Sequence, residues 1–149
     1  VSNRFTLMID YAHNAMSLKS LLTTLADYKP KRIVSLFGCG GNRSRDRRFE
    51  MGEISSEYAD LTVITSDNPR TEEPSAIIDD IIEGISGTRT PYKVIENRIE
   101  AIKYAVTIAQ KDDIIVLAGK GHETYQITGT EKRHFDEKEI VSEIFSTME

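Results

Sequence analysis

Residues 33–43 read Ile-Val-Ser-Leu-Phe-Gly-Cys-Gly-Gly-Asn-Arg, an apolar run that passes directly into a glycine-rich turn. Short runs rich in β-branched and aromatic side chains, closed by glycines, are typical of buried β-strands. Comparable apolar runs occur at residues 5–9, 61–65, 92–95 and 114–118. Apolar residues with helical spacing occur between these runs, at residues 18–25, 77–85, 99–109 and 140–145. The sequence therefore predicts strands that alternate with amphipathic helices.

This alternation predicts an α/β fold: a Rossmann-like, mostly parallel sheet flanked by helices on both faces. Two later runs, 125–128 and 132–135, are separated by Gly129 and Thr130 and predict a terminal β-hairpin. A chain of 149 residues suits one domain, so we expect residues 1–149 to form a single domain. Because the chain begins at Val1 and not at a methionine, we also expect it to be part of a longer protein.

The composition indicates a soluble globular protein, with 39% hydrophobic and 29% charged residues. The formal net charge of -5 argues against general attraction to nucleic acid or to an anionic membrane, so neither is an expected partner. No apolar run is long enough to span a bilayer. Cys39 is the only cysteine, which excludes an internal disulfide and fits a reducing, cytoplasmic location.

Chemically rich segments follow four of the predicted strands, at residues 10–14, 38–48, 66–73 and 119–123. In an open α/β sheet, ligands bind in the crevice beyond the carboxyl ends of the strands. The carboxyl ends of parallel strands share one edge of the sheet. We therefore expect these four segments to form the ligand site.

The segment after residue 37 combines glycines with a cluster of arginines. The glycines allow a ligand to approach the backbone, and free N–H groups would favour an anion if a helix begins near Arg43. Fixed positive charge would come from Arg43, Arg45, Arg47 and Arg48, whose planar forks suit carboxylate or phosphate. The alternative is a glycine turn followed by a solvated basic helix face.

Segments 66–70 and 119–123 each present charged side chains from a short turn. Ser-Asp-Asn-Pro-Arg at 66–70 would hold Arg70 on a support stiffened by proline, although an ordinary turn with an exposed arginine is the simpler interpretation. In Gly-Lys-Gly-His-Glu at 119–123, the carboxylate could bind an ammonium group and Lys120 could meet an anion. His122 could act as a base, but a lone histidine is more often structural.

The segment Asp-Tyr-Ala-His-Asn at 10–14 ends the first predicted strand. Asp10 could accept hydrogen bonds from ribose hydroxyls, as acidic residues do at nucleotide-binding strand ends. Tyr11 or His13 could stack on a base. The alternative interpretation is helix capping by Asn14, and both interpretations can hold together.

Several common catalytic motifs are absent from the sequence. Neither the G-x-G-x-x-G dinucleotide fingerprint nor the G-x-x-x-x-G-K-[ST] phosphate loop occurs in the chain. No Cys/His cluster resembles a zinc site, and no Ser, His and Asp follow a hydrolase order. From these residues we predict no zinc site and no hydrolase triad, and we assign no metal site and no catalytic residue to this chain.

Taken together, the strand-end segments resemble those of the Mur ligase family, specifically the MurE type. The matching segments are 10–13, 37–43, 65–73 and 118–123, the last continued by Tyr125 and Gln126. They occur in family order, and Asp-Asn-Pro-Arg paired with Gly-Lys-Gly-His-Glu is the most specific feature. Departures from the commoner pattern are Ala15 and Met16, in place of Pro and Asp, and Ser44 and Phe49, in place of Asp and Pro.

The resemblance implies one domain of three. Mur ligases have an N-terminal domain that holds the UDP-sugar, a central ATPase domain with a P-loop, and a C-terminal Rossmann-like domain that binds the incoming amino acid. By this resemblance the chain is the third domain, and the N-terminal and central domains are absent from it. ATP and Mg²⁺ would be bound mainly by the missing central domain, which also carries a carbamylated lysine.

The resemblance also assigns the site residues. Contacts to the amino-acid substrate fall on Arg43, Asn68, Arg70, Gly119 and Glu123, and contacts to the nucleotide on Asp10 and His13. Arg70 would hold the distal carboxylate of diaminopimelate, while Glu123 and the Gly119 carbonyl would take its distal ammonium. L-Lysine lacks that carboxylate, and lysine-type relatives commonly have another residue at the position of Arg70.

The implied activity is ATP-dependent addition of meso-diaminopimelate to UDP-N-acetylmuramoyl-L-alanyl-D-glutamate in peptidoglycan synthesis, by the full-length enzyme and not by this domain alone. Three alternatives stay open: the same ligase using L-lysine, a free-standing binding module without catalysis, and a nucleic-acid binder using residues 43–48. The acidic balance and the lack of interleaved aromatic residues argue against the third alternative.

Overall fold

The computed structural model describes residues 5–85, 90–121 and 123–148 of the chain. Its elements, in chain order, are β1 (Phe5–Asp10), α1 (Ala15–Ala26), β2 (Ile33–Phe37), α2 (Arg45–Tyr58), β3 (Leu61–Ile64), α3 (Pro74–Ile85), β4 (Tyr92–Val94), α4 (Arg98–Ile108), β5 (Asp113–Ala118), β6 (Tyr125–Thr128), β7 (Glu131–His134) and α5 (Glu137–Met148). Strands and helices alternate up to β5, as the apolar periodicity predicts. The predicted strand bounds differ from these by no more than one residue at either end.

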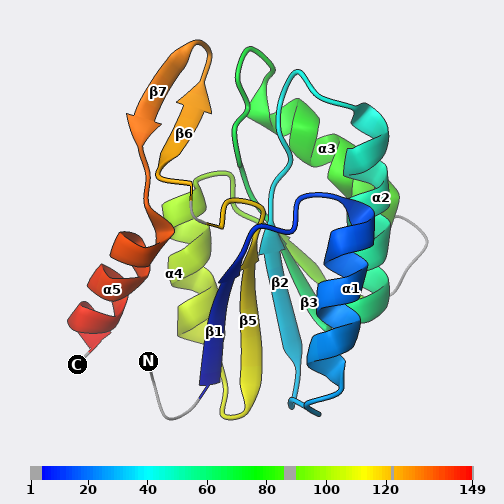
Figure 1. Cartoon of the computed structure of the whole chain (residues 1–149), viewed down its shortest axis with the longest axis vertical. Coiled ribbons are helices and arrows are strands. Elements are labelled where there is room, and N and C mark those ends of the chain that lie inside the picture. Colours follow the sequence, from blue (N-terminus) through cyan, green and yellow to red (C-terminus); the bar gives the residue numbers. More distant parts are fainter. Residues whose placement is uncertain (1–4, 86–89, 122, 149) are drawn as a thin grey trace.

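The strands β1 to β5 form one parallel sheet in the order β1-β5-β2-β3-β4 (Figure 1). The middle strand, β2, is buried along its whole length. Its side chains alternate between the two faces: Ile33 and Phe37 join the core under α1, α2 and α3, whereas Val34 and Leu36 join the core under α4 and α5. The prediction of a parallel α/β sheet with helices on both faces is confirmed.

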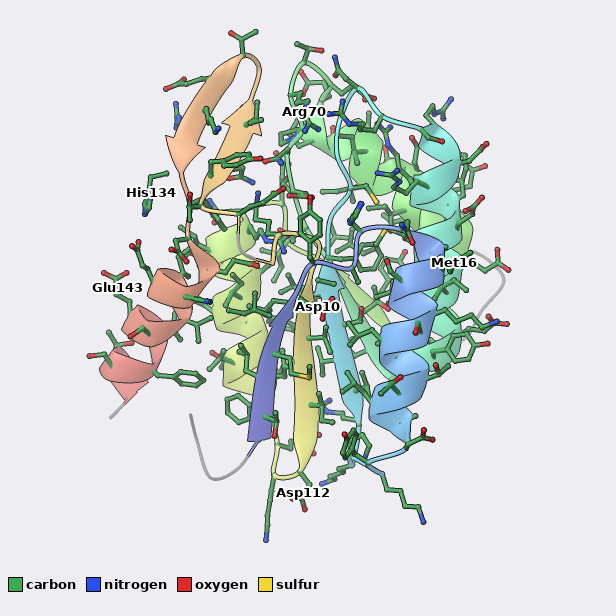
Figure 2. The ribbon with its side chains drawn as sticks, in the orientation of Figure 1. Asp10, Met16, Arg70, Asp112, His134 and Glu143 are labelled. Atoms are coloured by element: carbon green, nitrogen blue, oxygen red, sulfur yellow. The ribbon has the colours of Figure 1, made fainter. Side chains whose placement is uncertain are left out.

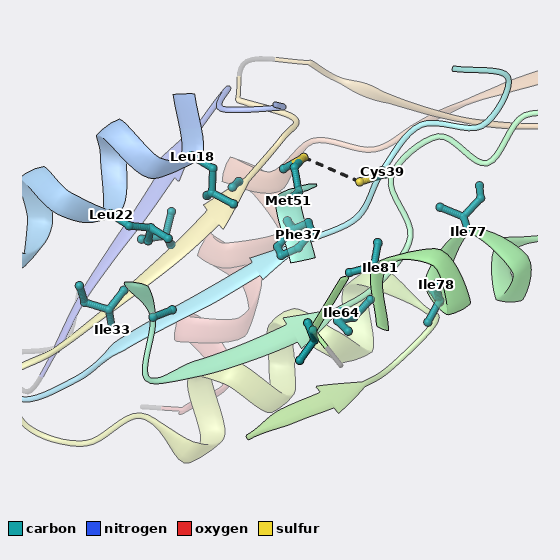
Figure 3. Packing of buried hydrophobic residues seen from close by; sticks show 14 of the residues in the cluster. Leu18, Leu22, Ile33, Phe37, Cys39, Met51, Ile64, Ile77, Ile78 and Ile81 are labelled. Atoms are coloured by element: carbon teal, nitrogen blue, oxygen red, sulfur yellow. Dashed lines mark hydrogen bonds between the residues drawn. The ribbon is translucent and has the colours of Figure 1, made fainter. Parts of the chain in front are cut away.

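The core under α1, α2 and α3 includes the apolar stripes that the sequence predicts for α1 and α3 (Figure 3). Leu18 and Leu22 come from α1, and Ile81 comes from α3. At the edge of this core the Cys39 sulfur lies 3.8 Å from the Met51 sulfur. Burial raises the pKa of the Cys39 thiol to about 12, so the thiol stays protonated and unreactive.

Helix α2 has no apolar stripe, and from the sequence a helix beginning near Arg43 is considered only as a condition under which an anion would bind there. The helix begins at Arg45. Its buried residues are Arg48, Met51, Gly52, Ser55 and Ser56. Gly52 lies so close to α3 that a Cβ atom there would be 2.3 Å from the Ile81 carbonyl oxygen. Small and polar residues make this helix contact, so apolar periodicity could not define the helix.

The β6–β7 hairpin stands beyond the carboxyl ends of the parallel strands (Figure 1). Its strands are antiparallel and are joined at Gly129 and Thr130, as predicted. An isolated parallel bridge between Arg70 and Thr128 connects the hairpin to the segment that follows β3. Within the described residues, none of the helices has the length and apolar character needed to cross a membrane.

Candidate functional site

The four strand-end segments gather at the carboxyl edge of the sheet, as the sequence predicts (Figure 2). Asp10 lies at the end of β1, and Arg70 lies beyond the end of β3 on the same side of the sheet. Backbone hydrogen bonds join the segments in pairs. The Gly119 amide donates to the Asp10 carbonyl at 3.0 Å, and the Gly41 amide donates to the Asn68 carbonyl at 2.7 Å. These bonds fix the positions of the segments relative to one another.

Arg70 is held by its backbone and by one end of its side chain. Its amide donates to the Ile127 carbonyl at 3.1 Å, and its φ of +53° is uncommon for a residue with a side chain. Nη1 donates to the Gly41 carbonyl at 3.0 Å and to the Asn68 carbonyl at 3.4 Å. No residue that the structure describes bonds to Nε or Nη2 of Arg70. The guanidinium therefore keeps donors that can bind a carboxylate.

Arg43 lies at the exposed rim of the glycine-rich loop. Its Nη1 donates to the Asn42 carbonyl at 3.1 Å. Asn42 is itself fixed from the segment after β3, because its amide donates to the Glu72 carboxylate and its Oδ1 accepts from the Thr71 hydroxyl at 2.9 Å. Arg43 thus adds an exposed positive charge to the loop whose Gly41 carbonyl holds Arg70.

Arg45 and Arg48 do not supply the free positive charge that the sequence suggested, and that expectation was wrong. Arg48 forms ion pairs with Glu72 at 2.6 Å and with Asp80 at 2.8 Å, and Arg45 pairs with Asp80 at 2.9 Å. A hydrogen bond from Arg48 lowers the pKa of Glu72, and one from Arg45 lowers the pKa of Asp80. The neutralising carboxylates are 24 or more positions away in sequence, so the arginine cluster gave no sign of them.

Lys120 is fully buried, and the anion that it meets is a carboxylate of the protein itself. Its Nζ pairs with Asp67 Oδ1 at 3.0 Å and donates to Asn68 Oδ1 at 3.1 Å and to the Tyr125 carbonyl at 2.8 Å. Since its side chain is 0% exposed, no ligand can reach the ammonium group. These bonds instead join the segments after β3 and β5 to the first residue of β6.

The contacts of Asn68 fix the orientation of its side-chain amide. Its Oδ1 accepts hydrogen bonds from Lys120 Nζ at 3.1 Å and from the Ile127 amide at 2.9 Å. Because both neighbours are donors, the amide oxygen faces them and Nδ2 points the other way. Nothing within the described part of the chain accepts a hydrogen bond from Nδ2. Asn68 therefore has N–H donors to offer a ligand.

Glu123 places a carboxylate at the edge of this cluster. Its Oε2 accepts a hydrogen bond from the Tyr11 hydroxyl at 3.4 Å, and its Oε1 lies 3.9 Å from Lys120 Nζ. The negative charge of Glu123 raises the pKa of Tyr11. The side chain of Glu123 is 17% exposed, which leaves the carboxylate open to a cationic ligand. His122, the candidate base, lies outside the described residues.

The segment after β1 caps a helix and presents a carboxylate. Asn14 caps α1 as predicted, because its Oδ1 accepts from the backbone amide three residues later at 2.9 Å. Asp10 Oδ1 accepts from the Ala12 amide at 2.9 Å, and Asp10 Oδ2 has no partner among the described residues. His13 Nδ1 lies 2.9 Å from the Tyr11 carbonyl oxygen, and the two rings are 4.7 Å apart between centroids. Asp10 can therefore accept a hydrogen bond from a hydroxyl group.

These side chains bring opposite charges to one edge of the sheet. Arg70 and Arg43 offer guanidinium donors, and Glu123 offers a carboxylate. Such a site can bind a zwitterion, with its carboxylate on the arginines and its ammonium on Glu123. Among the described residues, no three His, Cys, Asp or Glu side chains form a group that could hold a metal ion.

A hollow of about 840 Å³ lies elsewhere, at the opposite end of the sheet. Phe5, Tyr28 and Asp112 are among the residues that line it. Figure 2 shows Asp112 at the amino end of β5, far from Asp10. None of the four strand-end segments contributes to this hollow. The candidate site is therefore the carboxyl edge of the sheet and not the larger hollow, because the charged side chains that converge at the strand ends can bind and orient a ligand.

Arg98 is a residue that the sequence analysis missed. Its Nη1 donates to the Ser66 carbonyl and its Nη2 to the Ala118 carbonyl, both at 3.0 Å, while Nε pairs with Glu137 at 2.8 Å. Ser66 is the first residue of the segment 66–73 and Ala118 directly precedes the segment 119–123, so Arg98 fixes the spacing between these two site segments. In the sequence Arg98 is only the first residue of a helix, and its carboxylate partner comes 39 positions later.

The sequence matches the family described as "Mur ligase, glutamate ligase domain" over residues 1–121. The UDP-N-acetylmuramoyl-L-alanyl-D-glutamate–2,6-diaminopimelate ligase of Clostridioides difficile (strain 630) is 49% identical over 143 residues, which cover 96% of this chain and 30% of that protein. The protein of the same name from Caldanaerobacter subterraneus subsp. tengcongensis is 51% identical over 145 residues, which cover 97% of this chain and 30% of that protein. A solved structure of a ligase of this name superimposes with a TM-score of 0.92 at 37% identity, covering 99% of this chain and 30% of that one.

The chain thus spans about 30% of the length of the curated relatives that it matches. The family match extends over well more than half of the chain, and the structural similarity over nearly all of it. Both include the segments after β1, β2 and β3. The chain therefore belongs to the Mur ligase family, within its C-terminal, glutamate ligase domain.

Proposed function

We propose that this chain is the amino-acid-binding domain of a longer, ATP-dependent ligase that adds meso-diaminopimelate to UDP-N-acetylmuramoyl-L-alanyl-D-glutamate in peptidoglycan synthesis. The observation that carries the proposal is the pairing, at one edge of the sheet, of the Glu123 carboxylate with the Arg70 guanidinium, whose Nε and Nη2 have no partner among the described residues. The names of the relatives support the same assignment. In this proposal the whole chain forms one domain, and the domains that bind the UDP-sugar and ATP lie outside it.

Diaminopimelate carries an ammonium–carboxylate head at each end, and we assign its distal head to this site. Arg70 would bind the distal carboxylate through Nε and Nη2, with Arg43 adding positive charge and Asn68 Nδ2 a further donor. Glu123 and the Gly119 carbonyl would bind the distal ammonium. A head group held in this way leaves the other amine of the diamino acid free to react.

In ligases of this kind, ATP supplies the activation that turns the D-glutamate side-chain carboxylate into an acyl phosphate. The amine of the diamino acid then displaces phosphate, which forms the amide bond and releases ADP and phosphate. The contribution of this chain is to position that amine. Asp10 would accept a hydrogen bond from the ribose, and His13 would lie beside the nucleotide. The Mg²⁺ ligands belong to the central domain in this proposal, so the isolated domain is inactive.

Arg70 favours diaminopimelate over L-lysine. Lysine has no distal carboxylate, so the guanidinium would lose its partner at a cost of about 2 kcal/mol or more. A nucleic-acid-binding role through residues 43–48 loses support, because Arg45 and Arg48 are already paired with carboxylates. A cytoplasmic location belongs to the proposal because the reaction consumes ATP.

Turnover by the full-length protein tests this proposal. ADP should form when ATP, Mg²⁺, the UDP-sugar dipeptide and meso-diaminopimelate are all present, and L-lysine should be a much poorer substrate. No ADP from the full-length protein with all substrates present would refute the ligase assignment and favour a binding module. Equal turnover of L-lysine would keep the ligase and refute the choice of amino acid.

A further inference from the structure

The segment after β1 and the segment after β5 are held together at Tyr11. Besides the bond between the Gly119 amide and the Asp10 carbonyl, the backbone of Gly121 packs directly on the tyrosine. A Cβ atom on Gly121 would lie 2.8 Å from Tyr11 Cβ, and the φ of +53° at Gly121 also favours glycine. The two segments therefore meet in a contact too close to admit a larger side chain at residue 121.

The hydroxyl of Tyr11 reaches across this contact to the amino-acid site. It donates to Glu123 Oε2 at 3.4 Å. The other oxygen of Glu123 lies 3.9 Å from Lys120 Nζ, but that ammonium is already bonded to Asp67 and Asn68. The charge of Glu123 raises the pKa of Tyr11, so the phenol stays protonated and remains a donor near neutral pH.

On its other side Tyr11 contacts the segment that we assign to the nucleotide. Its carbonyl oxygen lies 2.9 Å from His13 Nδ1, and its ring lies 4.7 Å from the His13 ring. Asp10, the residue assigned to the ribose, immediately precedes it. Tyr11 is thus in contact with Glu123 through its hydroxyl and with the assigned nucleotide residues through its ring and backbone.

We propose that Tyr11 is a positioning residue. Its hydroxyl orients Glu123 toward the ammonium group of the amino acid. Its ring, through its contact with His13, links the position of that carboxylate to the segment assigned to the nucleotide. This inference rests on the proposed function, because it takes Glu123 as the ammonium ligand. It adds a role for Tyr11 that does not require contact with either substrate. The hydroxyl and the ring then have separable effects, which two substitutions can measure.

The experiment uses steady-state kinetics of the full-length ligase with Tyr11→Phe, Tyr11→Ala and Tyr28→Phe. Tyr28 is 75% exposed at the opposite end of the sheet, so Tyr28→Phe removes the same group as a matched control. Tyr11→Phe should raise the KM for meso-diaminopimelate roughly five- to tenfold, less than a short buried hydrogen bond to a charged group would give, because the bond is 3.4 Å long and Tyr11 is 44% exposed. The kcat and the KM for ATP should stay within about twofold of wild type. Tyr11→Ala, which also removes the ring, should raise both KM values.

A double-mutant cycle separates positioning from a general structural effect. In a Glu123→Gln background, Tyr11→Phe should change the KM for diaminopimelate less than about twofold, because the charged acceptor is gone. An unchanged KM in Tyr11→Phe, or an equal fold-change in both backgrounds, would overturn the role of the hydroxyl. A rise in only the amino-acid KM with Tyr11→Ala would overturn the coupling. If wild type and Tyr28→Phe both form no ADP, the proposed function itself fails, and this inference with it.

Discussion

Four arginines near the carboxyl edge of the sheet are used in two different ways. Arg48 and Arg98 are 1% and 2% exposed and are paired with carboxylates from other parts of the chain. Arg43 and Arg70 have no carboxylate partner among the described residues and are bonded to backbone carbonyls. An arginine that faces a built-in carboxylate fixes the fold, whereas one held by carbonyls keeps its charge for a ligand.

Removal of Arg98 should have the largest effect. Arg98→Met leaves the Glu137 carboxylate 0% exposed without its counter-charge, and breaking a buried pair on one side costs about 3–5 kcal/mol. Urea unfolding of the chain should show this loss in the free energy of unfolding. The double variant Arg98→Met, Glu137→Leu should recover most of it, since it leaves no buried charge. Equal destabilisation of the single and double variants would contradict the pairing.

Arg70→Lys should have the next largest effect, on substrate binding and not on stability. Lysine keeps the charge but loses the planar fork, so the KM for diaminopimelate should rise by roughly 10- to 30-fold in the full-length enzyme. The free energy of unfolding should change by less than about 0.5 kcal/mol. Arg133→Lys, on the exposed hairpin, serves as the control. If Arg70→Lys lost as much stability as Arg98→Met, the proposed difference between ligand-binding and fold-stabilising arginines would be contradicted.

Acid should weaken the pairs of Arg48. The folded-state pKa values of Glu72 and Asp80 are lowered from 4.5 and 3.8 by hydrogen bonds from Arg48 and Arg45. A lowered pKa adds stability above the unfolded value, and that stability is lost as pH falls through the folded value. The melting temperature should therefore fall below about pH 4.5 more steeply in wild type than in Arg48→Met. If the melting temperature fell equally steeply with pH in both proteins, these ion pairs would not be responsible for the loss of stability in acid.

The exposed pair of His134 and Glu139 should have the smallest effect, with the opposite pH dependence. Its hydrogen bond raises the pKa of His134 above 6.5. A raised pKa adds stability that is present below pH 6.5 and is lost as pH rises through the folded value. Melting curves of His134→Gln should therefore differ slightly from wild type under mildly acidic conditions and coincide with it in alkali. A difference that grows with pH would contradict this sign.

The sheet and the place of the site could be predicted from sequence because both depend on local patterns. The apolar side chains of a run such as residues 33–37 are enough to indicate that the strand is buried. Parallel strands bring their carboxyl ends to one edge of the sheet. The capping role of Asn14 was equally local, since its partner is three residues away. The Gly129–Thr130 turn likewise followed from the residues of the hairpin itself.

The partners of buried charges could not be predicted, because they come from distant parts of the chain. From the sequence alone, Lys120 looks like a cation that could bind a ligand. In the fold its ammonium group contacts Asn68, which is 52 residues away in sequence, and the neighbouring Asp67. Arg48 similarly meets Asp80 only when α2 packs on α3. One sequence thus contains arginines of both kinds, and only tertiary structure separates them.

The central claim is that Arg70 recognises the distal carboxylate of the amino acid. Its most direct test is calorimetric titration of meso-diaminopimelate, and then of L-lysine, into the full-length wild-type and Arg70→Ala proteins. We predict that wild type binds diaminopimelate, that Arg70→Ala binds it roughly 30-fold more weakly or not at all, and that lysine binding is weak in both. Equal affinity of the two proteins for diaminopimelate would contradict this account.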